Sequence, residues 1–258
     1  MRAYKGQQVT EEHPIRRVFQ KPPAHSRGEL RHNSDIMKSL IRLPLAILTI
    51  LWWLGLSAHA LPNLHSVAQA VDEHYNNLKT LQAEFTEIYQ GAGIERTESG
   101  TLWLKKPGKM RWEYRSPEEK VFVGDGHDVW LYLPAEKQAR KSSMRNLNDL
   151  RSPLALLLGK AKLEKELQGL SFAPDVRPWK PEDAMLRGIP RGLEDRVRQV
   201  LLEVTPEHQI ARILIHGADE SITEYRFSEQ KEDVEVPGNR FRFSAPAGTE
   251  VTADETGE

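Results

Sequence analysis

The chain has 258 residues, no cysteine, and 36 basic against 37 acidic side chains, which leaves a formal net charge of -1. This balance argues against a protein that coats nucleic acid, because such proteins carry a strong basic excess. The absence of cysteine excludes thiolate chemistry and the common cysteine-based zinc sites. Hydrophobic residues make up 39% of the chain and gather after residue 60 in alternating runs, which predicts a single domain over 61–258.

The first 36 residues are polar, contain prolines and show no sustained periodicity. Such a segment cannot bury enough apolar surface to offset the loss of chain entropy. We interpret residues 1–36 as a disordered leader, or as sequence that precedes the true start codon.

Residues 37–60 have the order of a secretory signal peptide. The stretch MKSLIR supplies two basic residues, LPLAILTILWWLGL supplies fourteen mostly apolar ones, and a small-x-small pattern ends at Ala60. The alternative is a transmembrane anchor, but the apolar run is shorter than the ~20 residues that span a bilayer. We therefore expect cleavage after Ala60 and export of a fold that needs no disulfide. Because a lipoprotein anchor is built on a cysteine thioether, the exported protein is expected to carry no such anchor.

The exported part opens with an amphipathic helix predicted over 62–79. Its apolar residues recur at three-and-four spacing and are Leu64, Val67, Ala68, Val71, Tyr75 and Leu78. Strand-like patterns broken by glycine and proline turns then predict strands over 81–90, 94–107, 109–117, 119–126, 127–134 and 137–145. A succession of hairpins of this kind is typical of an antiparallel meander.

A second helix is predicted over 152–167, where Ser152 can cap the helix, Pro153 fits the first turn and leucines fill one side. Residues 173–188 are broken by prolines and are expected to form a long connection. Strands are predicted again over 196–206, 209–219, 221–230 and 239–246, before an acidic tail from Gly248 that is expected to fray. The fold class that follows is mainly β (α+β): one strongly curved antiparallel sheet of roughly ten strands, with two or three helices on its concave side.

Motifs for catalysis are missing from the sequence. It contains no HExxH, GxSxG, Walker A or GxGxxG pattern. The stretch GDGHD (124–128) offers three possible metal ligands, but Gly-Asp-Gly between two strands is more typical of a tight turn. Carboxylate pairs such as Glu118 and Glu119 arise by chance in a chain with 28% charged residues. We expect no enzymatic activity, no metal and no cofactor.

The aromatic residues are concentrated in strands that are apolar on one or both faces. In KMRWEYRSP, alternation places Met110, Trp112 and Tyr114 on one face and charged residues on the other. In HDVWLYLP and TLWLK both faces are apolar, so both need cover unless one lines a cavity. The pattern leaves two interpretations open: a core packed by helices, or a hydrophobic cleft that takes a lipid-like ligand.

The stretch GTLWLKKPGKMRWEYRSPEEKVFVGDGHDVWLYLPAEKQ resembles the core of the outer-membrane lipoprotein carrier (LolA) family. The leucine helix SPLALLLG and the closing RFRFSAPAGTEV are similar to the family's later elements, so the resemblance covers about residues 62–252. It implies a half-open β-barrel covered by helices that enclose a hydrophobic cavity. It also implies a periplasmic carrier that takes acylated lipoproteins from an inner-membrane ABC transporter to an outer-membrane acceptor. We expect a monomer that binds no nucleic acid.

We expect the cavity and the core around it to be lined by apolar residues from the sheet and the second helix, without assigning which strand face is the cavity face. These residues are Trp103, Met110, Trp112, Val121, Val123, Trp130, Tyr132, Leu154, Leu157 and Leu158. The resemblance also implies a basic residue that tethers a helical lid. Lys106 stands at that position, where arginine is usual, and either forms a weaker latch or shares the role with Arg111.

A Pro-rich stretch over 171–196 does not match the family securely, and we expect it to rim the cavity or to form a docking surface. The alternative function is a sensor or regulatory protein that uses the same half-barrel to report mislocalised lipoprotein or another amphiphile. Sensors of that kind carry an additional domain, for which we expect no room in a mature chain that starts at residue 61. A secreted hydrolase is the third and least favoured interpretation.

Overall fold

The structure, a computed structural model, describes residues 63–144 and 162–253. The first half contains α2 (Leu64–Asn77), β1 (Thr80–Gly91), β2 (Ile94–Lys105), β3 (Lys109–Ser116), β4 (Lys120–Gly124), β5 (Asp128–Leu133) and β6 (Gln138–Ser143). The second contains α3 (Leu163–Glu166), β7 (Leu167–Phe172), β8 (Ala184–Pro190), β9 (Val197–Val204), β10 (Ile210–Gly217), β11 (Ile222–Glu232), the 3-10 helix η3 (Gly238–Phe241) and β12 (Glu250–Ala253).

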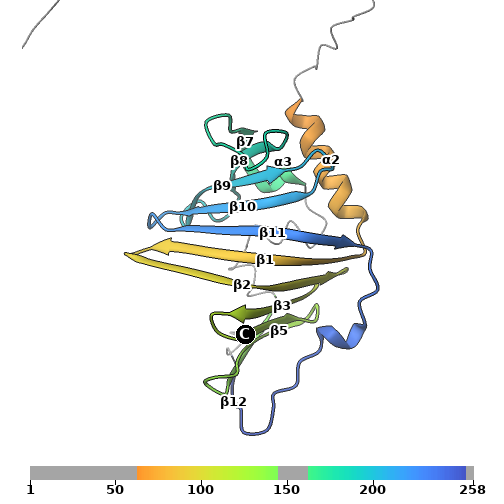
Figure 1. The fold of residues 1–258 in the computed structure, drawn as a ribbon, viewed down its shortest axis with the longest axis vertical. Helices are drawn as coiled ribbons and strands as arrows, with labels where there is room; N and C mark the ends of the chain where they lie inside the picture. Colours follow the sequence, from red (N-terminus) through yellow and green to blue (C-terminus); the bar gives the residue numbers. More distant parts are fainter. Residues whose placement is uncertain (1–62, 145–161, 254–258) are drawn as a thin grey trace, which may run out of the picture. The chain divides into compact units, whose positions relative to one another are not determined.

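All described strands belong to one open, curved sheet in the order β12-β6-β5-β4-β3-β2-β1-β11-β10-β9-β8-β7 (Figure 1). Neighbours pair antiparallel, except that β12 adds to β6 in parallel. The β1–β2 hairpin turns through Ala92 and Gly93, both with positive φ, which suits the right-handed twist of its long strands. The mainly β fold class and the open curved sheet are therefore confirmed.

Pairing register sorts the side chains onto two faces. Leu102 pairs with Trp112 and Leu104 with Met110, so these residues share a face, which we call the helix face because α2 packs on it. Helix α2 buries Ala68, Val71 and Tyr75 there, at the end of the strands where β1 begins (Figure 1). The largest buried cluster of the described residues lies on this side, with α2 and α3 covering residues of β1–β3 and β7–β11.

The opposite face is covered by irregular chain. After β11, residues 233–249, which we call the C-terminal strap, leave the middle of the sheet and lead to β12 at its edge (Figure 1). Val236 and Phe241 of the strap bury Trp103, and Phe243 lies 5.3 Å from the rings of both Trp130 and Tyr132. Loop 173–183 covers a second apolar cluster on this face, formed by Ala173, Met185 and Leu201.

The predicted helix over 62–79 and the strands up to residue 143 are confirmed, as are β9, β10 and β11. The predicted helix over 152–167 falls mainly outside the described residues, and its end is wrong because Leu167 begins β7. The connection expected over 173–188 is wrong at its end, where Ala184 begins β8. Pairing with β9 holds β8 in place despite the surrounding prolines.

The C-terminal expectations need two corrections. The strand predicted over 239–246 is absent, because η3 and an unpaired extended stretch lie there. Its alternating Arg-Phe pattern arises because Phe241 and Phe243 pack against the sheet while Arg242 between them is exposed. The tail expected to fray from Gly248 instead supplies β12, the one parallel strand of the described sheet.

Candidate functional site

The helix face is built around an aromatic cluster. Trp112 makes edge contacts with Phe85, Tyr225 and Phe227 at ring-centroid distances of 4.7, 6.0 and 6.4 Å. Gly100 lies between Phe85 and Tyr114 in the pairing, and a side chain there would meet the Glu113 carbonyl oxygen at 1.9 Å. Glycine at this position permits the close approach of the β3 backbone. On either side of Gly100, the rings of Phe85 and Tyr114 lie 4.8 Å apart.

Burial on the helix face is uneven. Beneath α2 and α3, side chains such as Leu186, Leu202 and Ile213 are fully buried. The remaining apolar side chains that pack on this cluster are half-buried and include Met110, Tyr114, Phe122, Leu170, Phe172, Val197, Ile215 and Tyr225. Part of the apolar helix face therefore keeps solvent-accessible area after the described chain has folded.

The C-terminal end of α2 is tied to the sheet by polar contacts. The Tyr75 hydroxyl accepts a hydrogen bond of 2.8 Å from the Ile210 N–H, and burial raises the pKa of this tyrosine above its ordinary value. His74 Nε2 lies 2.9 Å from Glu232 Oε1 on β11. The middle of α2 contacts α3, because the Leu163 N–H donates to Asp72, and at the N-terminal end of α2 His65 lies 3.0 Å from Glu164.

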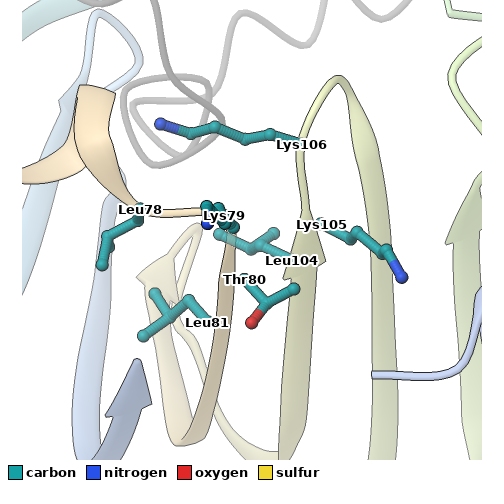
Figure 2. Close-up of a pocket in the computed structure, with 7 residues that line it drawn as sticks. All are labelled: Leu78, Lys79, Thr80, Leu81, Leu104, Lys105 and Lys106. Carbon is teal, nitrogen blue, oxygen red and sulfur yellow. The ribbon is translucent and has the colours of Figure 1, made fainter. Parts of the chain in front are cut away.

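Lys106 makes a further contact with α2. Its ammonium group donates to the backbone carbonyl of Tyr75, one of the last-turn carbonyls that lack a partner inside a helix. Partial burial lowers the pKa of Lys106, and the Asp233 carboxylate opposes that shift. Figure 2 shows Lys106 and Lys105 pointing in different directions beside a small pocket of about 10 Å³, whose lining also includes Leu78, Thr80, Leu81 and Leu104.

The two residues expected to form the latch lie on different faces. Lys106 reaches α2, whereas Arg111 lies on the opposite face, where its Nη1 donates to the Arg240 carbonyl of the strap at 3.1 Å. Its Nε lies 2.5 Å from Glu113. Lys105 likewise donates to the strap, through the Val236 carbonyl at 2.7 Å.

The residues expected to line the cavity are divided in the same way. Met110 and Trp112 lie on the helix face, whereas the other five described members lie on the face covered by the strap, namely Trp103, Val121, Val123, Trp130 and Tyr132. Leu154, Leu157 and Leu158 fall outside the described residues. Four further residues of the helix face were not predicted from the sequence: Phe85, Phe122, Tyr225 and Phe227. Alternation in LQAEFTEIYQ could have indicated Phe85, because it places Leu81, Ala83 and Phe85 together.

The Pro-rich stretch over 171–196 contributes the last two residues of β7, all of β8 and the loop on the opposite face. The ring of Trp179 in this loop lies against the guanidinium groups of Arg212 and Arg226, each 4.8 Å from the ring centroid. The backbone N–H of Trp179 and the Nε of Arg212 donate to the two oxygens of the fully buried Glu203 carboxylate, at 2.7 and 2.6 Å. Burial, together with the neighbouring Glu203, raises the pKa of Asp183 to about 6.

The turn GDGHD has the tight-turn geometry that was favoured for it. Asp125 Oδ1 accepts the backbone N–H groups of His127 and Asp128, both at 2.8 Å. Within the described ranges, no three His, Asp or Glu side chains are placed so that they could hold a metal ion. No helix in the described part of the chain is long and apolar enough to cross a membrane.

The sequence of this chain matches the model of a known protein family. The family model described as outer membrane lipoprotein carrier protein LolA matches residues 76–244, which is 169 of the 258 residues. The chain belongs to the LolA family. The match begins before β1 and ends within the strap, so it includes strands β1 to β11 and leaves out β12. Members of this family are carriers without enzymatic activity, and the chain is accordingly not an enzyme.

Curated relatives and solved structures extend the comparison. The chain is 30% identical to an outer-membrane lipoprotein carrier protein of Nitrosospira multiformis over 183 residues, covering 69% of this chain and 84% of the relative. It is 31% identical to the carrier of Dechloromonas aromatica over 208 residues, covering 78% and 96%. A crystal structure of an uncharacterized conserved protein from Thermus thermophilus aligns with a TM-score of 0.48 at 15% identity, covering 73% of this chain and 98% of that one.

Proposed function

We propose that the helix face binds the acyl chains of lipoproteins and that the protein carries them through the periplasm from the inner to the outer membrane. The observation that supports this most directly is the apolar, aromatic face that stays partly accessible around Met110, Phe122 and Tyr225. Membership of the LolA family and similarity to proteins named as outer-membrane lipoprotein carriers agree with it.

The physical need for a carrier follows from the hydrophobic effect. Each methylene exposed to water costs ~0.8 kcal/mol, so one long acyl chain costs on the order of 10 kcal/mol. A lipoprotein therefore crosses an aqueous space at a useful rate only if its chains stay covered. A face built of Trp, Phe, Tyr and Met side chains offers apolar contact with little demand on the shape of the chain.

Release of the cargo requires a cover that can move, and α2 is the candidate. Besides its apolar contacts, a small set of polar contacts holds it, among them the bond from Lys106 to the Tyr75 carbonyl. We propose that Lys106 is a latch that opening of α2 must break. A lysine makes a single-point contact where arginine can make two parallel bonds, which favours a latch that opens readily.

The partners in this proposal are an inner-membrane ABC transporter that releases lipoproteins and an outer-membrane acceptor that receives them. The protein would act as a monomer and reach the periplasm through the predicted signal peptide over 37–60. Leu154, Leu157 and Leu158 would add to the lining from the segment outside the described residues.

The test is release of a labelled lipoprotein from spheroplasts into the soluble fraction by the purified protein. Wild type is expected to release acylated cargo and not a cargo whose acylated cysteine is replaced. A matched pair of variants assigns the face: Phe122→Ala on the helix face should reduce release several-fold, and Tyr132→Ala on the opposite face should not. Equal release by both variants would refute the assignment, and no release by wild type with an active transporter would refute the carrier function.

A further inference from the structure

The loop over 173–183 connects β7 to β8 and covers an apolar cluster on the opposite face. Ala173, Met185 and Leu201 are buried there, with Val176 and Leu214 packed against them. Three of the loop's residues are prolines, which supply no backbone N–H. The loop therefore has few donors of its own, and the contacts that hold its middle come from the side chains of the sheet.

Two contacts tie the middle of the loop to one buried ion pair. The backbone N–H of Trp179 donates to Glu203 Oε1 at 2.7 Å, and Arg212 Nη2 donates to the Arg177 carbonyl at 3.1 Å. Arg212 Nε in turn donates to Glu203 Oε2 at 2.6 Å. Glu203 is fully buried and Arg212 is 7% exposed. Both contacts of the loop therefore depend on the charge and the position of Glu203.

The arginines at this ion pair are already balanced by two glutamates. Arg212 Nη1 lies 3.7 Å from Glu224 Oε1 on β11, and Arg226 Nε lies 2.8 Å from the same oxygen. Two guanidinium groups thus face the two carboxylates of Glu203 and Glu224. Asp183 brings a third carboxyl group to Glu203, after the two guanidinium charges have been balanced.

Asp183 is therefore a surplus carboxyl group in a buried place. It is 8% exposed, and among the described residues no hydrogen-bond donor reaches its buried Oδ1. Its side-chain neighbour Glu203 is an acceptor, and the nearby Lys180 and Glu182 of the loop are exposed, with Lys180 also close to Glu207. An ionised Asp183 would place a second negative charge beside Glu203, whereas a protonated Asp183 can donate a hydrogen bond to it.

We propose that loop 173–183 is a pH-dependent cover, which stays closed while Asp183 and Glu203 share one proton and opens more often once that proton is lost. Loss of the proton makes the two carboxylates repel each other, and Glu203 is the acceptor that holds the Trp179 N–H. Opening would uncover Met185 and Leu201. The inference goes beyond the proposed function, because it concerns the opposite face and not the helix face.

The direction of the pH effect follows from the linkage between proton binding and closure. Burial first, and then the neighbouring Glu203, raise the pKa of Asp183 from an ordinary value of 3.8 to about 6 in the closed loop. The closed loop therefore binds the proton more tightly than the open loop does. The contribution of this proton to closure is complete below about pH 4 and is lost as the pH rises through about 6. Between pH 5 and pH 7.5, a pKa difference of this size raises the equilibrium constant for opening about tenfold.

The test is hydrogen exchange of the Trp179 amide in the full-length protein at pH 5 and pH 7.5, expressed as protection relative to the intrinsic exchange rate at each pH. In wild type we expect the protection of this amide to be about tenfold lower at pH 7.5. The Trp179 amide should also be less protected than the amides of Leu201 and Leu202 in β9, because the loop opens without unfolding of the sheet. Equal protection of Trp179 at both pH values, or protection as high as in β9, would overturn the proposal.

Two variants assign the effect to a residue. Asp183→Asn has no proton to lose and keeps a donor beside Glu203, so the protection of Trp179 should be the same at both pH values. The matched control is Glu182→Gln, which removes the adjacent exposed carboxylate and should keep the tenfold difference. A pH dependence that survives in Asp183→Asn would exclude Asp183 as its cause. A pH dependence that disappears in Glu182→Gln would contradict the assignment to Asp183 as well.

Discussion

The two faces of the sheet are both apolar, yet different structures cover them. The strap fixes the opposite face: Thr80, Lys105 and Arg111 all bond to its backbone carbonyls, and its Phe241 is buried against Trp103 of the sheet. The helix face is covered by α2 and α3, and part of its aromatic surface remains accessible. An apolar strand face is therefore core or binding surface according to what covers it, and its composition alone does not distinguish the two.

The largest expected effect is on the centre of the helix face. Trp112 is only 4% exposed and contacts three aromatic rings, so Trp112→Ala should lower the free energy of unfolding by about 3 to 5 kcal/mol. Trp130→Ala, at a half-buried position on the opposite face, should cost about 1 to 2 kcal/mol. Urea denaturation measures both, and equal losses would show that the two aromatic groups are equally integral to the core.

The strap tests whether the opposite face is structural. Phe241 is 1% exposed, so Phe241→Ala should lower the free energy of unfolding by about 3 kcal/mol. The affinity of the Phe241→Ala variant for an acyl ligand, measured on the folded fraction, should match that of wild type because the helix face is unchanged. A large loss of affinity at unchanged stability would contradict the separation of the two faces.

The loop on the opposite face should respond to pH through Asp183. Because burial and Glu203 raise its folded-state pKa to about 6, the folded protein binds this proton more tightly than the unfolded chain does. Its contribution to stability is complete below about pH 4 and is lost as the pH rises through about 6. Asp183→Asn should therefore raise the free energy of unfolding at pH 7.5 by about 1 kcal/mol. Chemical denaturation at pH 5 and pH 7.5 would show this, and a variant with the same pH dependence as wild type would refute it.

The smallest expected effects are those of replacing two adjacent lysines, which bond to different parts of the chain. Lys106→Met removes the bond to α2 and Lys105→Met removes the bond to the strap, each at a cost of about 1 kcal/mol or less. Hydrogen exchange should quicken at the α2 amides in the first variant and at the strap amides in the second. If both variants change the same amides, Lys106 does not act on α2 alone.

The alternation of apolar and polar residues was sufficient to assign side chains to a face of the sheet wherever one face of the strand is polar. In KMRWEYRSP it placed Met110, Trp112 and Tyr114 together, as the structure shows. In HDVWLYLP it could not choose between Trp130 and Leu131, because both faces are apolar. The choice depends on pairing across strands, which places Leu131 with Phe122 and Trp130 with Val123. Such long-range register leaves no mark within a single strand.

The wrong predictions for two segments also have physical reasons. Strand β8 lies among prolines whose local preference is for turns, but its Leu186 pairs with Leu202 and is completely buried. The strap has a strand-like pattern without strand partners because its phenylalanines pack on the side chains of the sheet. Lys106, the proposed latch, could be placed only by resemblance, since its contact with Tyr75 depends on how α2 lies against the sheet.

The most direct test of the central claim is photo-crosslinking of a lipoprotein that carries a diazirine in its acyl chain, followed by mass spectrometry of the carrier. We expect adducts on helix-face residues such as Met110 and Phe122. We expect none on the strap-covered Trp130 and Tyr132. Adducts concentrated on the opposite face, or spread equally over both, would contradict the assignment of the helix face as the cargo site.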